Sequence, residues 1–91
     1  MRRNMQSVYA ILMAIEADPS VDGVEEMEVT SETELGLTLP HKDFVFHYAL
    51  LVNENYIDGY IDLSDPLHFC IHGLTWKGHD LLEAYRNRSS L

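Results

Sequence analysis

Residues 57–72 decide the fold, and they read IDGYIDLSDPLHFCIH. Apolar and polar residues alternate on both sides of a Ser-Asp-Pro turn, and this period of two predicts two β-strands that share one apolar face. Because paired residues lie on the same face of a sheet, Ile61 can oppose Phe69 or Ile71 but not Cys70. The loop of the predicted hairpin therefore holds three or five residues.

Apolar residues at helical spacing predict three helices around this hairpin. The first spans residues 3–17, and Asn4 is its expected N-cap. The second spans residues 40–54 and stops at Asn55, a residue type that tolerates the left-handed conformation of a C-terminal cap. The third follows the hairpin, with Thr75 as its cap.

Two smaller elements are predicted between the first and second helices. Met27 and Val29 alternate with polar residues, which predicts a short strand with one buried face. Ser31 and Glu34 fit a capping box at the start of a short helical turn. The whole chain, residues 1–91, is therefore predicted to be a single α+β domain. We expect it to be winged-helix-like, with three main helices, a short helical turn, a short strand and a β-hairpin wing in the C-terminal half.

Negative charge is concentrated in one part of the chain, whose net charge is −9. Eight acidic residues and no Lys or Arg lie in the segment 16–34; they are Glu16, Asp18, Asp22, Glu25, Glu26, Glu28, Glu32 and Glu34. Such a surface attracts a basic partner and repels nucleic acid and anionic membranes, although many acidic surfaces are only solvated. DNA is bound largely through Lys and Arg, so the charge argues against ordinary DNA recognition.

Cysteine content and hydropathy bear on the compartment of the protein. The only cysteine, Cys70, excludes an internal disulfide and agrees with a reducing compartment. The longest apolar stretch, residues 10–15, is too short to span a bilayer. We therefore expect a cytoplasmic protein with no membrane partner.

Three motifs carry a resemblance to a known family. They are Arg3-Asn4-Met5 with Ile11-Leu12, then His47-x-x-Leu50-Leu51 with Ile57-x-Gly59, and finally Leu74-Thr75-Trp76-x-Gly78-His79-Asp80-x-Leu82. In these motifs the chain resembles a family of short winged-helix proteins of bacteria and their phages, domain of unknown function 2513. The resemblance implies a winged-helix fold and a phage or prophage setting in a bacterial host cell. It implies no catalytic residue.

The second strand of the hairpin contains the weak candidates for a metal site. His68, Cys70 and His72 alternate along it and so share one face, and imidazole and thiolate are good zinc ligands. Asp58 or Asp62 on the opposing strand offers an oxygen ligand. The spacing matches no recognised zinc motif, and the favoured interpretation is a polar outer face whose His residues pair with Asp across the strands. We therefore expect no metal or other cofactor, and no set of residues typical of an enzyme.

DNA binding is the alternative function. The helix over residues 40–54 would enter the major groove, and the DNA-binding candidates are His41, Lys42, His47 and Arg86. His47 also fits a partly buried, hydrogen-bonded packing role. The arginines at the two ends of the chain would form a cluster if the terminal helices packed together; they are Arg2, Arg3, Arg86 and Arg88.

The favoured hypothesis is a non-enzymatic protein that acts through protein–protein contact. Its acidic surface would consist of Glu25, Glu26, Glu28, Glu32 and Glu34. A sharper form of this hypothesis is DNA mimicry, in which the carboxylates occupy the nucleic-acid site of a defence nuclease, a CRISPR complex (as an anti-CRISPR protein) or a regulator. The alternative is a winged-helix transcriptional regulator that binds DNA. The chain is expected to be a monomer or a homodimer.

Overall fold

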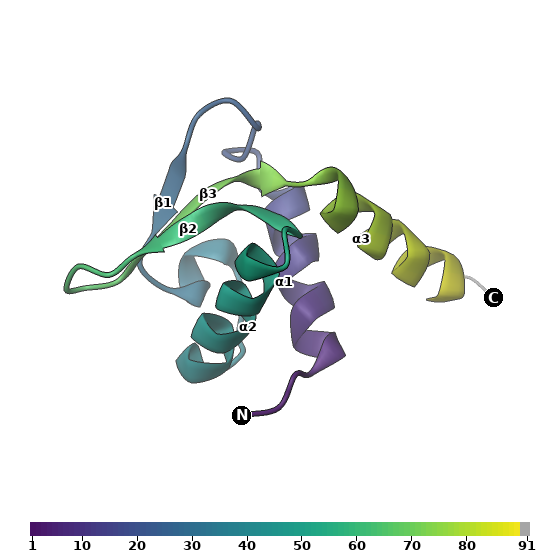
Figure 1. The fold of residues 1–91 in the computed structure, drawn as a ribbon, viewed down its shortest axis with the longest axis horizontal. Helices are drawn as coiled ribbons and strands as arrows, with labels where there is room; N and C mark the ends of the chain where they lie inside the picture. The colour runs from purple at the N-terminus through teal and green to yellow at the C-terminus, as the bar shows by residue number, and fades with distance from the viewer. Residues whose placement is uncertain (90–91) are drawn as a thin grey trace.

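Three helices and a three-stranded antiparallel sheet make up residues 1–89, which the computed structural model describes (Figure 1). In chain order the elements are α1 (Met5–Ala17), β1 (Met27–Val29), the 3-10 turn η1 (Glu32–Leu35), α2 (His41–Asn53), β2 (Ile57–Asp62), β3 (His68–Leu74) and α3 (Trp76–Ser89). This order confirms the predicted α+β class with its short strand, helical turn and hairpin. The last two residues of the predicted domain, 90 and 91, lie outside the described residues.

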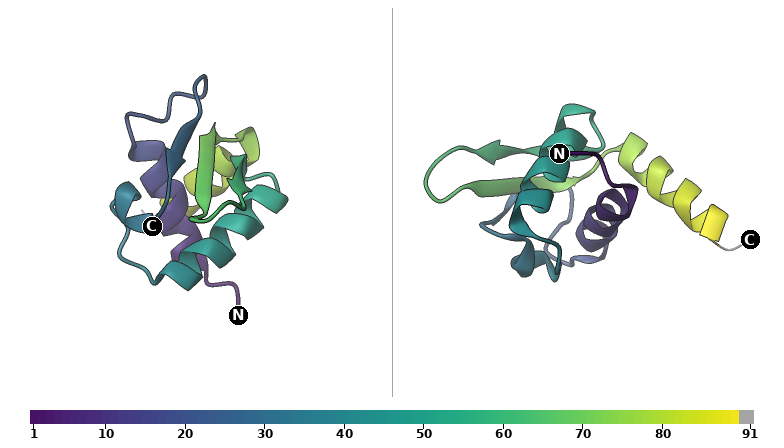
Figure 2. Two further views of the ribbon diagram at one scale, coloured as in Figure 1. Left: turned by 90° about the vertical axis from the view of Figure 1, so that its left-hand side faces the viewer. Right: turned by 90° about the horizontal axis from the view of Figure 1, so that it is seen from below.

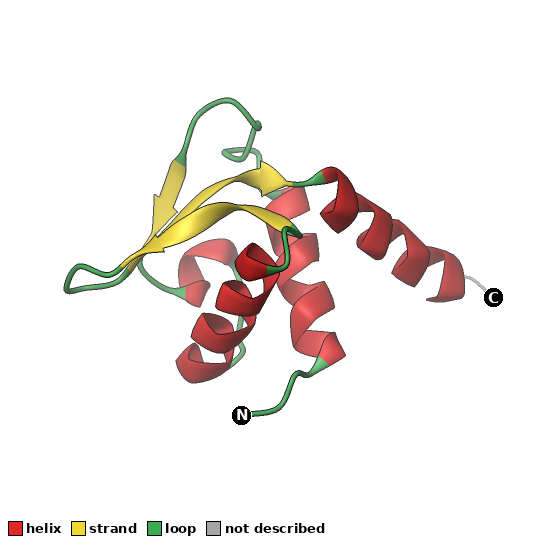
Figure 3. Cartoon of the chain, viewed as in Figure 1, coloured by secondary structure: helices red, strands yellow, loops and turns green. Residues whose placement is uncertain are grey.

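The sheet and the first two helices form two layers. α1 and α2 lie against one face of the sheet, while the other face has no helix over it (Figures 2 and 3). α3 leaves the end of β3 and extends away from the body of the molecule (Figure 1). None of the helices within residues 1–89 is long and apolar enough to cross a membrane.

The register of the sheet follows the alternation of the sequence. The strand order is β1-β3-β2, so β3 is central and has a neighbour on each side. Ile61 lies opposite Phe69, one of its two predicted partners, and residues 63–67 form the longer of the two predicted loops between β2 and β3, with five residues. A bulge between Asp58 and Gly59 shifts the register near the start of β2.

The core lies between the sheet and the two helices. Its fully buried apolar side chains come from α1, α2, β3 and α3; they are Ile11, Leu12, Ile15, Phe44, Tyr48, Phe69, Ile71 and Leu82. The ring centroids of Phe44 and Tyr48 lie 4.7 and 5.2 Å from that of Phe69. The Tyr48 hydroxyl donates a hydrogen bond to the Cys70 carbonyl oxygen at 2.6 Å, which joins α2 to the central strand.

Side-chain caps set the ends of the helices. Asn4 Oδ1 accepts a hydrogen bond from the Gln6 amide at 2.9 Å, and Thr75 Oγ1 accepts one from the Gly78 amide at 3.0 Å. Asn55 follows α2 in the left-handed conformation, with φ of 64°. These three predictions are confirmed, and the helix bounds differ from the predicted ones by one or two residues.

α3 packs on α1 through its first three turns. Leu82 is fully buried, and Tyr85 stacks on Tyr9 with ring centroids 3.9 Å apart. Arg86 binds Glu16 near the C-terminal end of α1, whereas Arg3 precedes the other end of that helix. A helix of 13 residues is roughly 20 Å long. The predicted cluster of terminal arginines is therefore wrong.

Candidate functional site

The face of the sheet that no helix covers is acidic. We call it the outer sheet face and define it by Glu26, Glu28, Asp58, Tyr60, Asp62, His68, Cys70 and His72. Glu28, Cys70 and Tyr60 form one row across the three strands, because Glu28 and Tyr60 both pair with Cys70. All four carboxylate residues of this face are exposed. No Lys or Arg occurs in residues 18–40 or 54–75, so the strands of this face and the residues next to them contain no cation other than His.

Cys70 is the main correction on this face. The alternation of the sequence puts it on the polar side of the hairpin, yet only 1% of the residue is exposed. The reason is the third strand: Glu28 flanks Cys70 on one side and Tyr60 on the other. Burial and the nearby carboxylates raise the pKa of the Cys70 thiol. Contacts with this thiol and with Glu26 raise the pKa of the Tyr60 phenol above its ordinary value.

The potential metal ligands come together in a different set from the predicted one. Ligand atoms of Glu26, Glu28 and Cys70 lie within 4.8 Å of one another, and the His72 Nε2 atom lies 3.5 Å from a Glu26 carboxylate oxygen. These carboxylates come from β1 and the residue before it, whereas the prediction looked for them on β2. His68 pairs in register with Asp62 instead, as the favoured interpretation expects for the hairpin. The candidate metal ligands that the structure brings together are therefore Glu26, Glu28 and Cys70.

The acidic residues predicted to form the partner-binding surface do not all lie on the surface. Glu25, Glu26, Glu28 and Glu34 are exposed, but Glu32 is only 6% exposed. Its assignment to the acidic partner-binding surface is therefore wrong. η1 turns the Glu32 carboxylate toward His41, whose Nδ1 atom lies 3.3 Å away.

The Glu34 carboxylate is hydrogen-bonded within the chain, because it caps the turn η1. Its carboxylate accepts hydrogen bonds from the Thr30 amide and hydroxyl at 2.6 and 2.8 Å and from the Ser31 amide at 3.2 Å. The bond from the Thr30 amide is the main reason why the pKa of Glu34 lies below its ordinary value. Glu34 therefore serves the fold as well as the charge of the surface.

Two of the four DNA-binding candidates make contacts within the chain, His47 in the interior and Arg86 on the surface. His47 is 1% exposed, and its Nε2 atom accepts a hydrogen bond from the Asn4 amide at 2.9 Å. The ring is then neutral with its proton on Nδ1, which donates to the Asp43 carbonyl oxygen at 2.7 Å. This confirms the packing interpretation of His47 and excludes contact with a base edge. Arg86 makes a two-point contact with Glu16, at 3.2 and 2.5 Å, which also lowers the pKa of Glu16. His41 and Lys42 are exposed at the start of α2.

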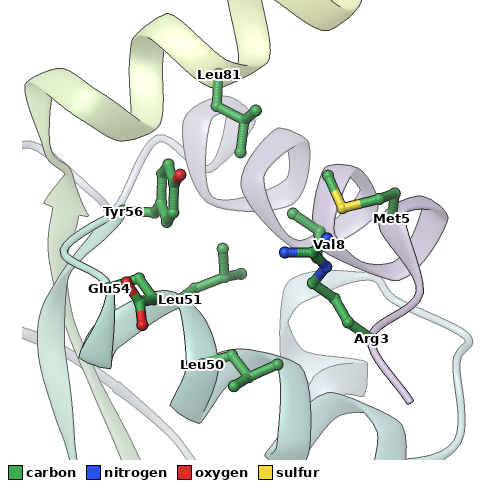
Figure 4. Close-up of a pocket in the computed structure, with 8 residues that line it drawn as sticks. All are labelled: Arg3, Met5, Val8, Leu50, Leu51, Glu54, Tyr56 and Leu81. Carbon is green, nitrogen blue, oxygen red and sulfur yellow. The ribbon is translucent and has the colours of Figure 1, made fainter.

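An apolar cleft between α1, α2 and α3 was not predicted from the sequence. It has a volume of about 540 Å³ and is lined by Arg3, Met5, Val8, Leu50, Leu51, Glu54, Tyr56 and Leu81 (Figure 4). The sequence feature that could have indicated this cleft is Leu50, together with Phe46 one turn earlier on the same helix. Both are apolar and partly exposed on α2, on a side of the helix outside the stripe that fills the core.

Comparison with protein families identifies the chain. The family model described as hypothetical protein (DUF2513) matches residues 2–90. The chain belongs to the DUF2513 family. This confirms the resemblance drawn from the three sequence motifs. No curated protein and no solved structure matches the DUF2513 chain.

The DUF2513 match covers every described helix and strand, and with them both the outer sheet face and the cleft. The two surfaces differ in chemistry: the sheet presents carboxylates, and the cleft has apolar side chains with one charge of each sign.

Proposed function

We propose that this DUF2513 chain is a non-enzymatic winged-helix domain that binds a basic surface of another protein. In this arrangement α2 corresponds to the recognition helix and the β2–β3 hairpin to the wing. The binding surface consists of the outer sheet face and of Glu25, which precedes it. The observation that carries the proposal is the exposed carboxylates of this surface in segments that contain no Lys or Arg.

Charges of one sign that lack nearby counter-charges produce a strong local potential. Such a potential steers an oppositely charged partner and raises its association rate. Within residues 1–89, the carboxylates of the outer sheet face have one ion-pair partner, the partly exposed His72 beside Glu26. The surface therefore keeps its negative charge for an external partner.

DNA mimicry is the sharper form of this proposal. Glu28 on β1, Glu26 just before that strand, and Asp58 and Asp62 on β2 place four exposed carboxylates on one face of the sheet. A concentration of negative charge is also what a basic nucleic-acid site meets in a phosphate backbone. We infer that the partner is a host protein whose basic site otherwise binds DNA, in keeping with the phage setting that the resemblance implies.

The alternative, a transcriptional regulator that binds DNA, has less support. A recognition helix needs side chains that reach base edges. α2 offers the exposed His41, Lys42 and Asn53 for this role. Lys77 is also engaged within the chain, because its ammonium donates to the Glu54 carbonyl oxygen and lies 4.4 Å from the centroid of the Tyr56 ring.

The proposal is tested by affinity capture from bacterial cells with paired variants. The test variant is Glu25→Lys with Glu28→Lys, and the control is Asp80→Lys with Glu83→Lys on α3. Each variant changes the charge by the same amount at exposed positions. We expect the test variant to lose a partner that the control keeps, and we expect this partner to dissociate as salt rises. Equal capture by both variants would contradict the proposal.

Two further measurements separate the alternatives. The captured partner should bind DNA, and the DUF2513 chain should displace that DNA in competition; a partner whose DNA binding is unaffected would exclude mimicry. The chain alone should fail to shift a labelled duplex at low salt. A shift that Lys42→Ala weakens would instead favour the regulator.

A further inference from the structure

The cleft between α1, α2 and α3 is a second surface, separate from the outer sheet face. Apolar side chains make up most of its lining, among them Met5, Leu50 and Leu81, which are half-buried. Protein interiors leave little empty space, and water occupies such space stably only where several polar partners surround it. A cleft of about 540 Å³ with an apolar lining is therefore suited to be covered by apolar groups from outside the fold.

The two charged residues of the cleft lie on opposite sides of it. Arg3 precedes α1 and its guanidinium points over the cleft, whereas Glu54 comes from the end of α2 (Figure 4). Leu50 and Leu81 lie on the other two sides, with Leu51 and Val8 between them (Figure 4). The cleft therefore has an apolar centre with a positive and a negative end.

This pattern is complementary to itself. In a symmetric dimer a two-fold axis lies in the interface, and each residue to one side of the axis faces the residue on the other side in the second copy. An axis that crosses the cleft between Arg3 and Glu54 brings each Arg3 opposite the Glu54 of the other copy. We propose that the occupant of the cleft is a second copy of this chain, in a dimer held by an apolar centre and by two Arg3–Glu54 pairs.

The same two-fold axis determines which residues of the second copy contact Leu50 and Leu81. Leu50 and Leu81 lie along the direction of the axis, so each meets its own equivalent in the second copy. Both leucines are half-buried in the single chain, and the dimer removes their remaining apolar surface from water. The proposal thus specifies two charge pairs between unlike residues, Arg3 with Glu54, and two contacts between equivalent leucines.

Charge reversal tests the pairs by sedimentation equilibrium of the full chain. Arg3→Glu and Glu54→Arg should each weaken the dimer about tenfold, because each creates two contacts between like charges. The double variant should restore the affinity, since it only exchanges the two ends. Arg2→Glu is the matched control next to Arg3 and should leave the affinity within about threefold of that of the unchanged chain.

Cysteine cross-linking tests the position of the axis independently of charge. Leu50→Cys and Leu81→Cys should each form a disulfide-linked dimer under mild oxidation, and Glu83→Cys should not. The native Cys70 does not compete, because it is buried. Three results would overturn the proposal: a chain that stays monomeric at about 100 μM, a dimer indifferent to both reversals, or a double variant as weak as the single ones.

Discussion

Replacing Tyr48 by Phe removes one buried hydrogen bond and leaves the packing of the ring intact. The Tyr48 side chain is fully buried, and its hydroxyl donates to the Cys70 carbonyl oxygen at 2.6 Å. Loss of the hydroxyl leaves that carbonyl without this donor inside the core. Leaving a buried acceptor unsatisfied costs about 1–3 kcal/mol, so we expect the free energy of unfolding to fall by about 2 kcal/mol.

Urea denaturation followed by circular dichroism measures this loss. For a small domain the unfolding free energy changes by roughly 1–1.5 kcal/mol per molar urea, so the midpoint should fall by about 1.5 M. Tyr60→Phe is the matched control, because it removes the same atom from a residue that is 49% exposed. We expect the control to change stability by less than about 0.5 kcal/mol.

The pH dependence gives a second readout of the same bond. Burial raises the pKa of Tyr48 above its ordinary value of 10. The folded state therefore favours the neutral phenol, and its contribution is complete below pH 10 and declines as the pH rises above 10. The stability difference between the unchanged chain and the Phe variant should shrink over that range. A difference below about 0.5 kcal/mol at neutral pH, or one that grows above pH 10, would refute the reasoning.

Three further perturbations have expected outcomes. Gly78→Ala should lower the thermal midpoint, because the added Cβ would overlap the Tyr56 carbonyl oxygen. This cost should exceed the helix preference of Ala over Gly, which is about 1 kcal/mol. A raised midpoint would contradict the close contact between Gly78 and Tyr56. His47→Phe should cost about 2 kcal/mol in urea denaturation, since it leaves the Asn4 amide without its acceptor; an unchanged midpoint would mean that another group satisfies this amide. Glu34→Gln should reduce the loss of stability on acidification, because the lowered pKa of Glu34 stabilises the fold above pH 4.5 and this contribution disappears as the pH falls below that value. Denaturation curves from pH 3 to 7 measure the loss, and equal losses for the variant and the unchanged chain would contradict the prediction.

The sequence was sufficient for features that depend on neighbouring residues. The alternation of residues 57–72 limits the partner of Ile61 to Phe69 or Ile71, because a shift by one residue would turn the apolar side chains to solvent. The structure has Phe69. Asn4 and Thr75 are recognisable as caps because a cap acts on amides only two or three residues away. Local chemistry determines these features, so a local pattern reveals them.

The sequence was insufficient where a distant segment supplies the neighbour. Cys70 is buried because β1, some forty residues earlier, pairs along β3 and adds Glu28 beside the thiol. Arg86 is engaged because α3 returns to Glu16 at the end of α1. Glu32 faces inward because η1 is a tight turn whose orientation depends on the helix after it. In each case the relevant contact spans a separation over which the sequence carries no periodic signal.

Because its thiol is buried, Cys70 is a natural probe of local opening on the outer sheet face. A thiol reacts as the thiolate, and Cys70 is both shielded from reagent and held protonated by its surroundings. An alkylating reagent therefore reaches it when the Glu28 and Tyr60 side chains that flank it move aside or the strands separate. Because the chain has no other cysteine, the rate of alkylation followed by mass spectrometry reports how often this part of the sheet opens under native conditions, without any engineered label.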